Sequence, residues 1–383
     1  MQPIVELLAE LVRRPSINPM GRTDIPAELL FESRVTDYLE ACFREIGVPC
    51  ERQVVAPGRE NIIARYVPST PAPFTVLWEA HQDTVPVDGM IVEPFGARIE
   101  NGRLYGRGSC DVKGGIAYMF SAFARLVKEK PKGSAAVTLA FTVDEEHTFL
   151  GVQHLMQSGV RADGAIVAEP TGLEIVRTHK GVVRWQIETA GVACHSSRPD
   201  NGVNAVYRMA RLVQGIETYA KRLPTTRTDP LLGPPTLSLG VIQGGVSPNT
   251  VPDYCRVEID RRLIPGEDAT AAVDDVEVFL KAFPGVDFSF AMTKPRLSCP
   301  PLSPKGSEAL IERLGKAIDT IAGPHRVVAV PYGTDASTIA EAGVPAVVFG
   351  PGDIAQAHTK DEWIDLDQLE QAAEILYHFA TDH

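Results

Sequence analysis

The sequence predicts an α/β protein in which helices cover a largely parallel β-sheet, with a smaller α+β domain inserted into the chain. Two observations lead to this prediction. Short apolar runs alternate with helical stretches, and a region with a different order of elements separates the last apolar run from the others. The length of 383 residues suits two domains. Hydrophobic residues make up 44% and charged residues 22%, the balance of a globular protein with a sizeable core.

Helices are predicted at the start of the chain. Apolar residues recur at helical spacing over residues 4–12, and this helix should end near Pro15, because the residue before a proline avoids the helical region. A second helix is expected over residues 28–46. Buried strands are then predicted by apolar runs at residues 74–78, 136–143, 165–168 and 346–349, and helices at residues 115–128 and 151–157 separate the first three.

The middle of the chain has a different pattern. Strands are expected at residues 182–188, 237–239, 254–263 and 286–290, and helices at residues 204–219 and 269–282. This β-α-β-β-α-β order fits a ferredoxin-like α+β domain. A helix at residues 307–321 then precedes the last strand of the first sheet. We therefore expect residues 1–179 and 293–383 to form one discontinuous domain, with residues 180–292 inserted in it.

Composition excludes several classes of partner. The formal net charge of −12 argues against nucleic acid or an anionic membrane surface. The six cysteines form no C-x-x-C pair, which argues against a zinc knuckle or a dithiol redox site. Glu6 and Glu10 interrupt the apolar start of the chain, so no signal peptide is expected, and no run approaches the ~18 apolar residues of a membrane span. We expect a cytoplasmic protein.

Acidic residues and histidines follow the predicted strands where each strand ends, and one more acid lies in a glycine-rich loop before a helix. In chain order they are His81, Asp111, Glu145, Glu146, Glu169 and His358. In an open α/β sheet, ligands bind beyond the carboxyl ends of the strands. These side chains are therefore expected at one rim of the sheet.

Two histidines and four carboxylates at one place would repel one another without cations. Imidazole and carboxylate ligands suit zinc, cobalt or manganese, and one carboxylate can bridge two ions. Of the adjacent pair Glu145 and Glu146, one can bind metal while the other holds the attacking water. Asp83 can orient the imidazole of His81. Other hydrolase and cofactor motifs are not found: the glycine loop has Asp111 where a dinucleotide fingerprint needs glycine, and the sequence contains neither G-x-S-x-G nor H-E-x-x-H.

These segments resemble the M20 family of dinuclear metallopeptidases and deacylases. The matching segments occur in family order: residues 81–86 (HQDTVP), 106–115 (GRGSCDVKGG), 144–146 (DEE), 168–171 (AEPT) and 358–359 (HT). The resemblance implies a zinc-exopeptidase-like α/β sandwich that is the catalytic domain, with residues 180–292 as an inserted dimerisation or lid domain.

The resemblance also implies a role for each rim residue. Asp111 would bridge two metal ions, and Asp83 would assist catalysis beside the metal. Glu146 and His358 would complete one metal site, and His81 and Glu169 the other. Glu145 would be the general base that activates water and then protonates the leaving amine. The family also places a cis peptide bond after the bridging aspartate, here Asp111–Val112.

Four segments of the second half match the family less specifically. Residues 194–197 (CHSS) would supply His195, which in the family polarises the scissile carbonyl of the neighbouring subunit. Residues 244–252 would supply Asn249, and Gly333 and Thr334 would line the pocket that takes the substrate carboxylate. Residues 260–265 supply an arginine for the substrate carboxylate. Arg261 and Arg262 are adjacent, and we favour Arg262 from its spacing to Pro265.

The leading hypothesis is therefore an amidohydrolase of small N-acyl amino acids, similar to the acetylornithine deacetylases and succinyl-diaminopimelate desuccinylases of the family. It would use two divalent ions, zinc with cobalt or manganese as alternatives, and form a homodimer. A dipeptidase or carboxypeptidase of the same family is the alternative. Nothing in the motifs separates the two, because each reaction is attack of water on an amide beside a carboxylate.

Overall fold

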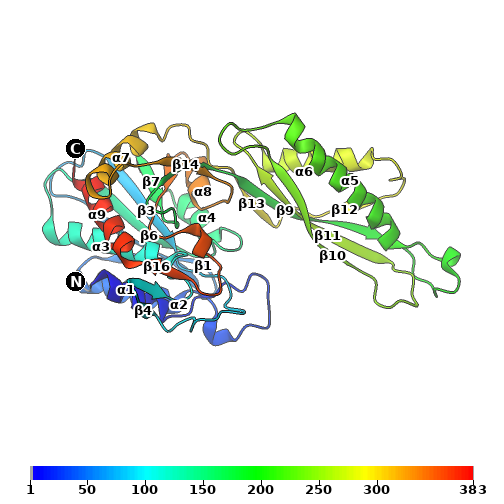
Figure 1. Cartoon of the computed structure of the whole chain (residues 1–383), viewed down its shortest axis with the longest axis horizontal. Helices are drawn as coiled ribbons and strands as arrows, with labels where there is room; N and C mark the ends of the chain where they lie inside the picture. Colours follow the sequence, from blue (N-terminus) through cyan, green and yellow to red (C-terminus); the bar gives the residue numbers. More distant parts are fainter. Residues whose placement is uncertain (1–2, 383) are drawn as a thin grey trace. The chain divides into compact units, whose positions relative to one another are not determined.

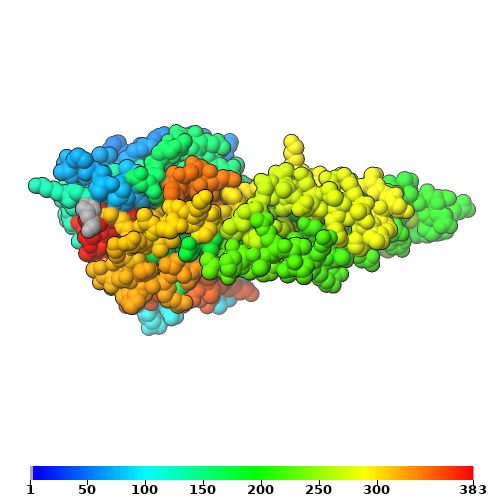
Figure 2. Space-filling view, turned by 90° about the horizontal axis from the view of Figure 1, so that it is seen from above, coloured from blue at the N-terminus to red at the C-terminus, as the bar shows by residue number. Residues whose placement is uncertain are grey.

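The computed structural model describes residues 3–382, which fold into two compact units. Of the described residues, unit 1 comprises 3–178, 304–329 and 334–382, and unit 2 comprises 179–303 and 330–333. Figure 2 shows that the N-terminal part of the chain (blue) and the C-terminal part (orange and red) lie side by side on the surface of unit 1. Unit 2 extends beyond the expected end at residue 292, because β13 (Leu297–Cys299) pairs with β9 (Gly181–Ala190).

The centre of unit 1 is an eight-stranded sheet whose inner strands are parallel. β3 (Thr75–His81) pairs with β6 (Ala136–Thr142) on one side and β7 (Gly164–Val167) on the other, and β7 pairs with β15 (Ala346–Val348). These four strands correspond to the four apolar runs of the sequence. The α/β class with a mostly parallel central sheet is thereby confirmed (Figure 1).

The edges of this sheet were not expected from the sequence. An antiparallel hairpin, β1 (Cys50–Ala56) and β2 (Arg59–Tyr66), extends it beyond β6. At the other edge lie β8 (Ile175–His179) and β14 (Val327–Val330). A separate small sheet joins β4 (Arg98–Glu100), β5 (Arg103–Tyr105) and β16 (Trp363–Asp365). β1 (CERQVVA) and β2 (RENIIARY) have neither a long apolar run nor a strict alternation of polar and apolar residues, so their sequence patterns did not predict strands.

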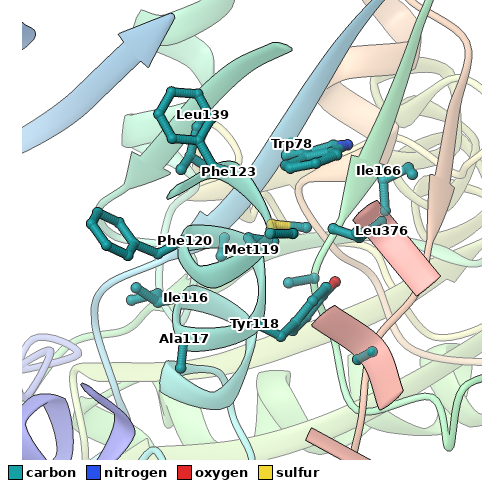
Figure 3. Packing of buried hydrophobic residues seen from close by; sticks show 14 of the residues in the cluster. Trp78, Ile116, Ala117, Tyr118, Met119, Phe120, Phe123, Leu139, Ile166 and Leu376 are labelled. Atoms are coloured by element: carbon teal, nitrogen blue, oxygen red, sulfur yellow. The ribbon is translucent and has the colours of Figure 1, made fainter. Parts of the chain in front are cut away.

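Helices cover both faces of the sheet. One apolar core joins the sheet to α1 (Ile4–Val12), α2 (Ser33–Glu45), α3 (Lys113–Glu129), α7 (Glu308–Ile321) and α9 (Leu366–Thr381). Figure 3 shows Met119 and Phe123 of α3 beside Trp78 of β3 and Leu139 of β6. The other face carries α4 (Leu150–Gln157) and α8 (Ala336–Glu341). Between residues 3 and 382, none of the helices combines the length and apolarity needed to cross a membrane.

The second helix begins later than its sequence pattern indicated. Residues 28–46 were expected to be one helix, but a short 3-10 turn (Ala27–Leu29) comes first and α2 starts at Ser33. The break coincides with Leu30 in an extended conformation and Phe31 at φ +64°, and neither conformation can continue a right-handed helix.

Unit 2 is a five-stranded sheet with two helices packed against it. The strand order is β10 (Thr236–Gly244), β11 (Tyr254–Leu263), β9 and β12 (Ala291–Met292), with β13 also on β9. α5 (Ala205–Thr226) and α6 (Ala269–Lys281) share an apolar core with the sheet. The strand expected at residues 286–290 is not formed. Phe288 and Phe290 pack against this core instead, and the pairing with β9 begins at Ala291.

Candidate metal centre

The carboxyl ends of the parallel strands bring the predicted side chains to one rim of unit 1. His81 is the last residue of β3 and pairs in register with Thr142, the last residue of β6. Glu145 and Glu146 follow β6, and Glu169 follows β7. Because adjacent parallel strands end at the same edge, these three segments meet at one place.

Two loops complete this rim. Asp111 lies just before α3, and its peptide bond to Val112 is cis, as the resemblance implies. His358 follows a 3-10 turn (Ile354–Gln356) beyond β15, and its backbone is left-handed, with φ +61°.

Asp111 lies between the two histidines. Its Oδ1 is 3.2 Å from Nε2 of His81, and its Oδ2 is 3.3 Å from Nε2 of His358. Nε2 of His358 is also 3.1 Å from Oε2 of Glu146. Each oxygen of one carboxylate thus faces a different imidazole, which is the arrangement of a bridging ligand.

Two groups of potential ligand atoms overlap at His81. His81, Asp111 and Glu146 form one, and His81, Glu145 and Glu169 form the other, with the ligand atoms of each group within 4.8 Å of one another. Glu145 is 9% exposed and its Oε2 lies 4.0 Å from Nε2 of His81. The structure therefore brings together all five residues expected to bind metal and the expected base.

Electrostatics indicate that this cluster requires positive charge. Burial raises the pKa of Glu145 and of Glu169 well above the usual range, and neighbouring carboxylates add to both shifts. Burial acts in the same direction on Asp111, but hydrogen bonds from His358 and His81 outweigh it and hold the pKa of Asp111 below its usual value. Hydrogen bonds to Asp111 and Glu146 raise the pKa of His358 to about 11. These shifts reflect the negative charge gathered around the site, which a divalent cation would balance.

Asp83 makes contacts that the sequence did not indicate. Nδ1 of His81 lies 2.9 Å from the backbone carbonyl of Asp83 and 3.7 Å from its carboxylate. The carboxylate accepts hydrogen bonds from the backbone N–H groups of Glu145, at 3.1 Å, and Glu146, at 3.2 Å. It therefore orients the Glu145–Glu146 turn, while the imidazole is oriented by the main chain rather than by the expected carboxylate.

Two residues of this region, Glu362 and Arg107, were not predicted from the sequence. Both are buried, and they form an ion pair at 2.5 Å beneath the loop that carries Asp111. Glu362 follows His358 closely in the sequence, but an acid in a polar segment gives no signal of burial. The one available signal was Arg107 itself, because an arginine inside the glycine-rich motif would need an acidic partner if it were buried.

Unit 2 carries the less specific set of predicted residues at two separate places. The loops of His195 and Asn249 lie side by side: His195 bridges to Thr250, and the N–H of Ser196 donates to the carbonyl of Asn249 at 3.0 Å. Both loops lie beyond the end of the β9–β11 pair where Ala190 faces Tyr254. Arg262 faces Val182 at the opposite end of the same pair.

The two adjacent arginines have opposite environments. Arg261 is 1% exposed and donates to Glu267 at 2.8 Å within unit 2. The side chain of Arg262 is 30% exposed and pairs with Asp260 at 2.7 Å. Arg262 is thus the more exposed of the two side chains, and its expected contact with the substrate carboxylate stays a prediction.

Gly333 and Thr334 fall on either side of the boundary between the two units. A Cβ on Gly333 would lie 3.4 Å from both Cys299 Sγ and the carbonyl of Lys180, which is tight packing within unit 2. Thr334 is fully buried, and its hydroxyl accepts from the N–H of Ala336 at the start of α8. Their expected contact with substrate stays a prediction.

Comparison with known proteins agrees with this geometry. The model of peptidase family M20/M25/M40 matches residues 77–382. The acetylornithine deacetylase of Myxococcus xanthus is 32% identical over 348 residues, covering 89% of each chain. Among solved structures, an M20 family metallo-carboxypeptidase from Sulfolobus solfataricus has a TM-score of 0.81 at 19% identity, with 100% of this chain and 99% of that chain covered. A dinuclear metal-binding M20 peptidase from Bacillus subtilis has a TM-score of 0.72 at 17% identity, covering 99% and 96%. This chain belongs to peptidase family M20/M25/M40 and is a metal-dependent hydrolase that acts on amide bonds.

Proposed function

We propose that this protein removes the acyl group from small N-acyl amino acids, using two divalent ions of which zinc is the first candidate. The observation that carries the proposal is the position of Asp111, with one carboxylate oxygen toward His81 and the other toward His358, beside the buried carboxylate of Glu145. The donor set of two imidazoles and several carboxylates fits zinc, and also cobalt or manganese.

The residues divide into two ligand sets around Asp111. Glu146 and His358 would hold one ion, and His81 and Glu169 the other, on the basis of their proximity. When bound, two such ions would supply Lewis-acid activation of water and of the scissile carbonyl. Glu145 would take the proton of the attacking water and pass it to the nitrogen of the leaving amine. Asp83 holds this base in place through the N–H groups of residues 145 and 146.

A deacylase is favoured by the acetylornithine deacetylase relatives, which match this chain over nearly its whole length. A carboxypeptidase or dipeptidase is the second candidate, supported in fold alone by the Sulfolobus solfataricus structure. In either reaction Arg262 would bind a free carboxylate of the substrate, because its guanidinium is partly exposed and can form a bidentate pair.

The geometry of unit 2 supports a homodimer in which two chains build each site. Arg262 lies eight positions along β11 from Tyr254, which is near the loops of His195 and Asn249. At about 3.4 Å per residue of an extended strand, that separation is roughly 27 Å. A small substrate cannot span it, so His195 and Arg262 of one chain cannot bind the same molecule. We infer that His195 and Asn249 act on the neighbouring subunit.

A substrate panel tests this proposal. Purified protein would be freed of metal with a chelator, reloaded with zinc or cobalt, and assayed with N-acetyl and N-succinyl amino acids, dipeptides and their methyl esters. We expect no turnover without metal, full activity at two ions per chain, and preference for an N-acyl amino acid with a free carboxylate. Full activity at one ion per chain would contradict the dinuclear site, and preference for dipeptides would favour the second candidate. The expected cytoplasmic location stays a prediction.

A further inference from the structure

Glu362 accepts hydrogen bonds along the loop that carries Asp111. Its Oε1 accepts from the N–H groups of Cys110 and Asp111, each at 3.0 Å. Its Oε2 accepts from the N–H of Gly108 at 3.1 Å and from Nη1 of Arg107 at 2.5 Å. One fully buried carboxylate thereby fixes the path of this loop up to the expected bridging ligand.

Arg107 connects the same carboxylate to two other segments of the rim. Its Nη2 donates to the carbonyl of Pro86 at 3.2 Å and to the carbonyl of Thr359 at 3.4 Å. Pro86 lies on the segment that follows His81, and Thr359 is the neighbour of His358. The pair is 3% and 0% exposed, so water does not compete for these contacts.

We propose that the Arg107–Glu362 pair is a positioning unit that sets the separation of His81, Asp111 and His358, and thereby the affinity of the site for its metal ions. The inference rests on the proposed dinuclear function. Neither residue points a donor atom at the site as a ligand. They act through the backbone of three loops, those that carry Pro86, Asp111 and Thr359.

Glu362→Gln is the sharpest test. Each carboxylate oxygen of Glu362 accepts from two N–H donors. In either orientation of the glutamine amide, its NH₂ group would face two donors and lose both hydrogen bonds. Zinc would be titrated into metal-free protein against a chromophoric chelator. We expect two ions in the wild type and affinity about 10–100-fold weaker for at least one ion in the variant, the usual effect of losing a group that orients metal ligands.

Glu267→Gln is the matched control. Glu267 also pairs with a buried arginine, Arg261, and accepts a backbone N–H, that of Ile264 at 2.9 Å, but it lies in unit 2. Thermal unfolding of the metal-free proteins should show a comparable loss of stability in both variants, with zinc affinity reduced only by Glu362→Gln. Arg107→Lys serves if Glu362→Gln does not fold, because lysine lacks the planar fork whose two nitrogens face different partners.

The outcomes separate the two proposals. Wild-type zinc affinity in Glu362→Gln, or in Arg107→Lys if that variant has to replace it, would overturn the positioning role and leave the dinuclear function standing. Failure of the wild type itself to bind two ions would overturn both. Equal loss of zinc affinity in Glu267→Gln would show that general destabilisation, and not loop position, is responsible, and would also overturn the inference.

Discussion

Glu145 and Glu146 are neighbours in sequence, yet their surroundings predict that substitution lowers kcat at Glu145 and metal affinity at Glu146. Glu145→Gln keeps the shape of the side chain and removes the base, so kcat should fall by about 10²–10⁴-fold while both metal ions stay bound. Glu146→Gln should instead weaken metal binding, because Glu146 lies 3.1 Å from His358 within one expected ligand set. Steady-state kinetics and metal analysis of the two variants side by side would distinguish these effects. A near-normal kcat in Glu145→Gln would place the base elsewhere.

Arg261 and Arg262 should also separate on substitution. Arg262→Ala should weaken substrate binding by the ~1.5–3 kcal/mol of a charge-assisted hydrogen bond, and KM should rise accordingly. Stability should change little, because the Arg262 side chain is 30% exposed. Arg261→Ala removes a buried side chain and leaves the partly buried Glu267 without its arginine, so it should lower the free energy of unfolding, by at most about 3–5 kcal/mol. Substrate kinetics and denaturant unfolding measure the two effects. A raised KM in Arg261→Ala, with Arg262→Ala unaffected, would reverse the assignment.

At the scale of elements, the approach of α3 to the end of β7 is set by Gly115. A Cβ at this position would lie 2.6 Å from Cβ of Ala168, which precedes Glu169, and 2.8 Å from Cγ2 of Val112, which follows Asp111. Gly115→Ala should therefore move these two ligand-bearing segments apart, cost about 1–3 kcal/mol of stability, and weaken metal binding.

The control for Gly115→Ala is Gly240→Ala. Gly240 lies in β10 of unit 2 and a Cβ there would meet nothing within 4 Å. Denaturant unfolding and zinc titration of both variants should show losses in Gly115→Ala alone. Unchanged zinc affinity in Gly115→Ala would contradict the prediction, because it would show that the contact at Gly115 does not set the separation of the ligand-bearing segments.

At the scale of the whole molecule, the proposed exchange of His195 between subunits predicts complementation. A His195→Ala chain and a Glu145→Gln chain should each be nearly inactive alone. In the mixed dimer one site combines the intact Glu145 of the first chain with the intact His195 of the second. Random exchange in a two-fold dimer should therefore restore about a quarter of the wild-type rate. Absence of recovery, with subunit exchange demonstrated by mass spectrometry of tagged chains, would show that His195 does not act across subunits.

The rim of unit 1 could be predicted from the sequence for a simple reason. Apolar runs locate the buried strands, parallel strands end at one edge, and the residue types just after them define the chemistry. His81, Glu145, Glu146 and Glu169 follow directly from this rule. Asp111, in the glycine-rich loop before a helix, and His358, some residues beyond the last apolar run, were expected at the same edge from their neighbouring elements, and the family motifs supported both.

The sequence by itself thus determined the α/β class, the inserted domain and the set of side chains at the rim, because each depends on local periodicity or on strand ends. Only the tertiary structure decided that the Asp83 carboxylate holds the Glu145–Glu146 turn, that Arg107 and Glu362 join three loops, and that Arg262 lies far from His195 along β11. Those contacts depend on which segments meet after folding, and Arg107 and Glu362 are 255 residues apart. No local pattern predicts such a pairing, because the sequence around an acidic residue does not show whether its side chain will be buried.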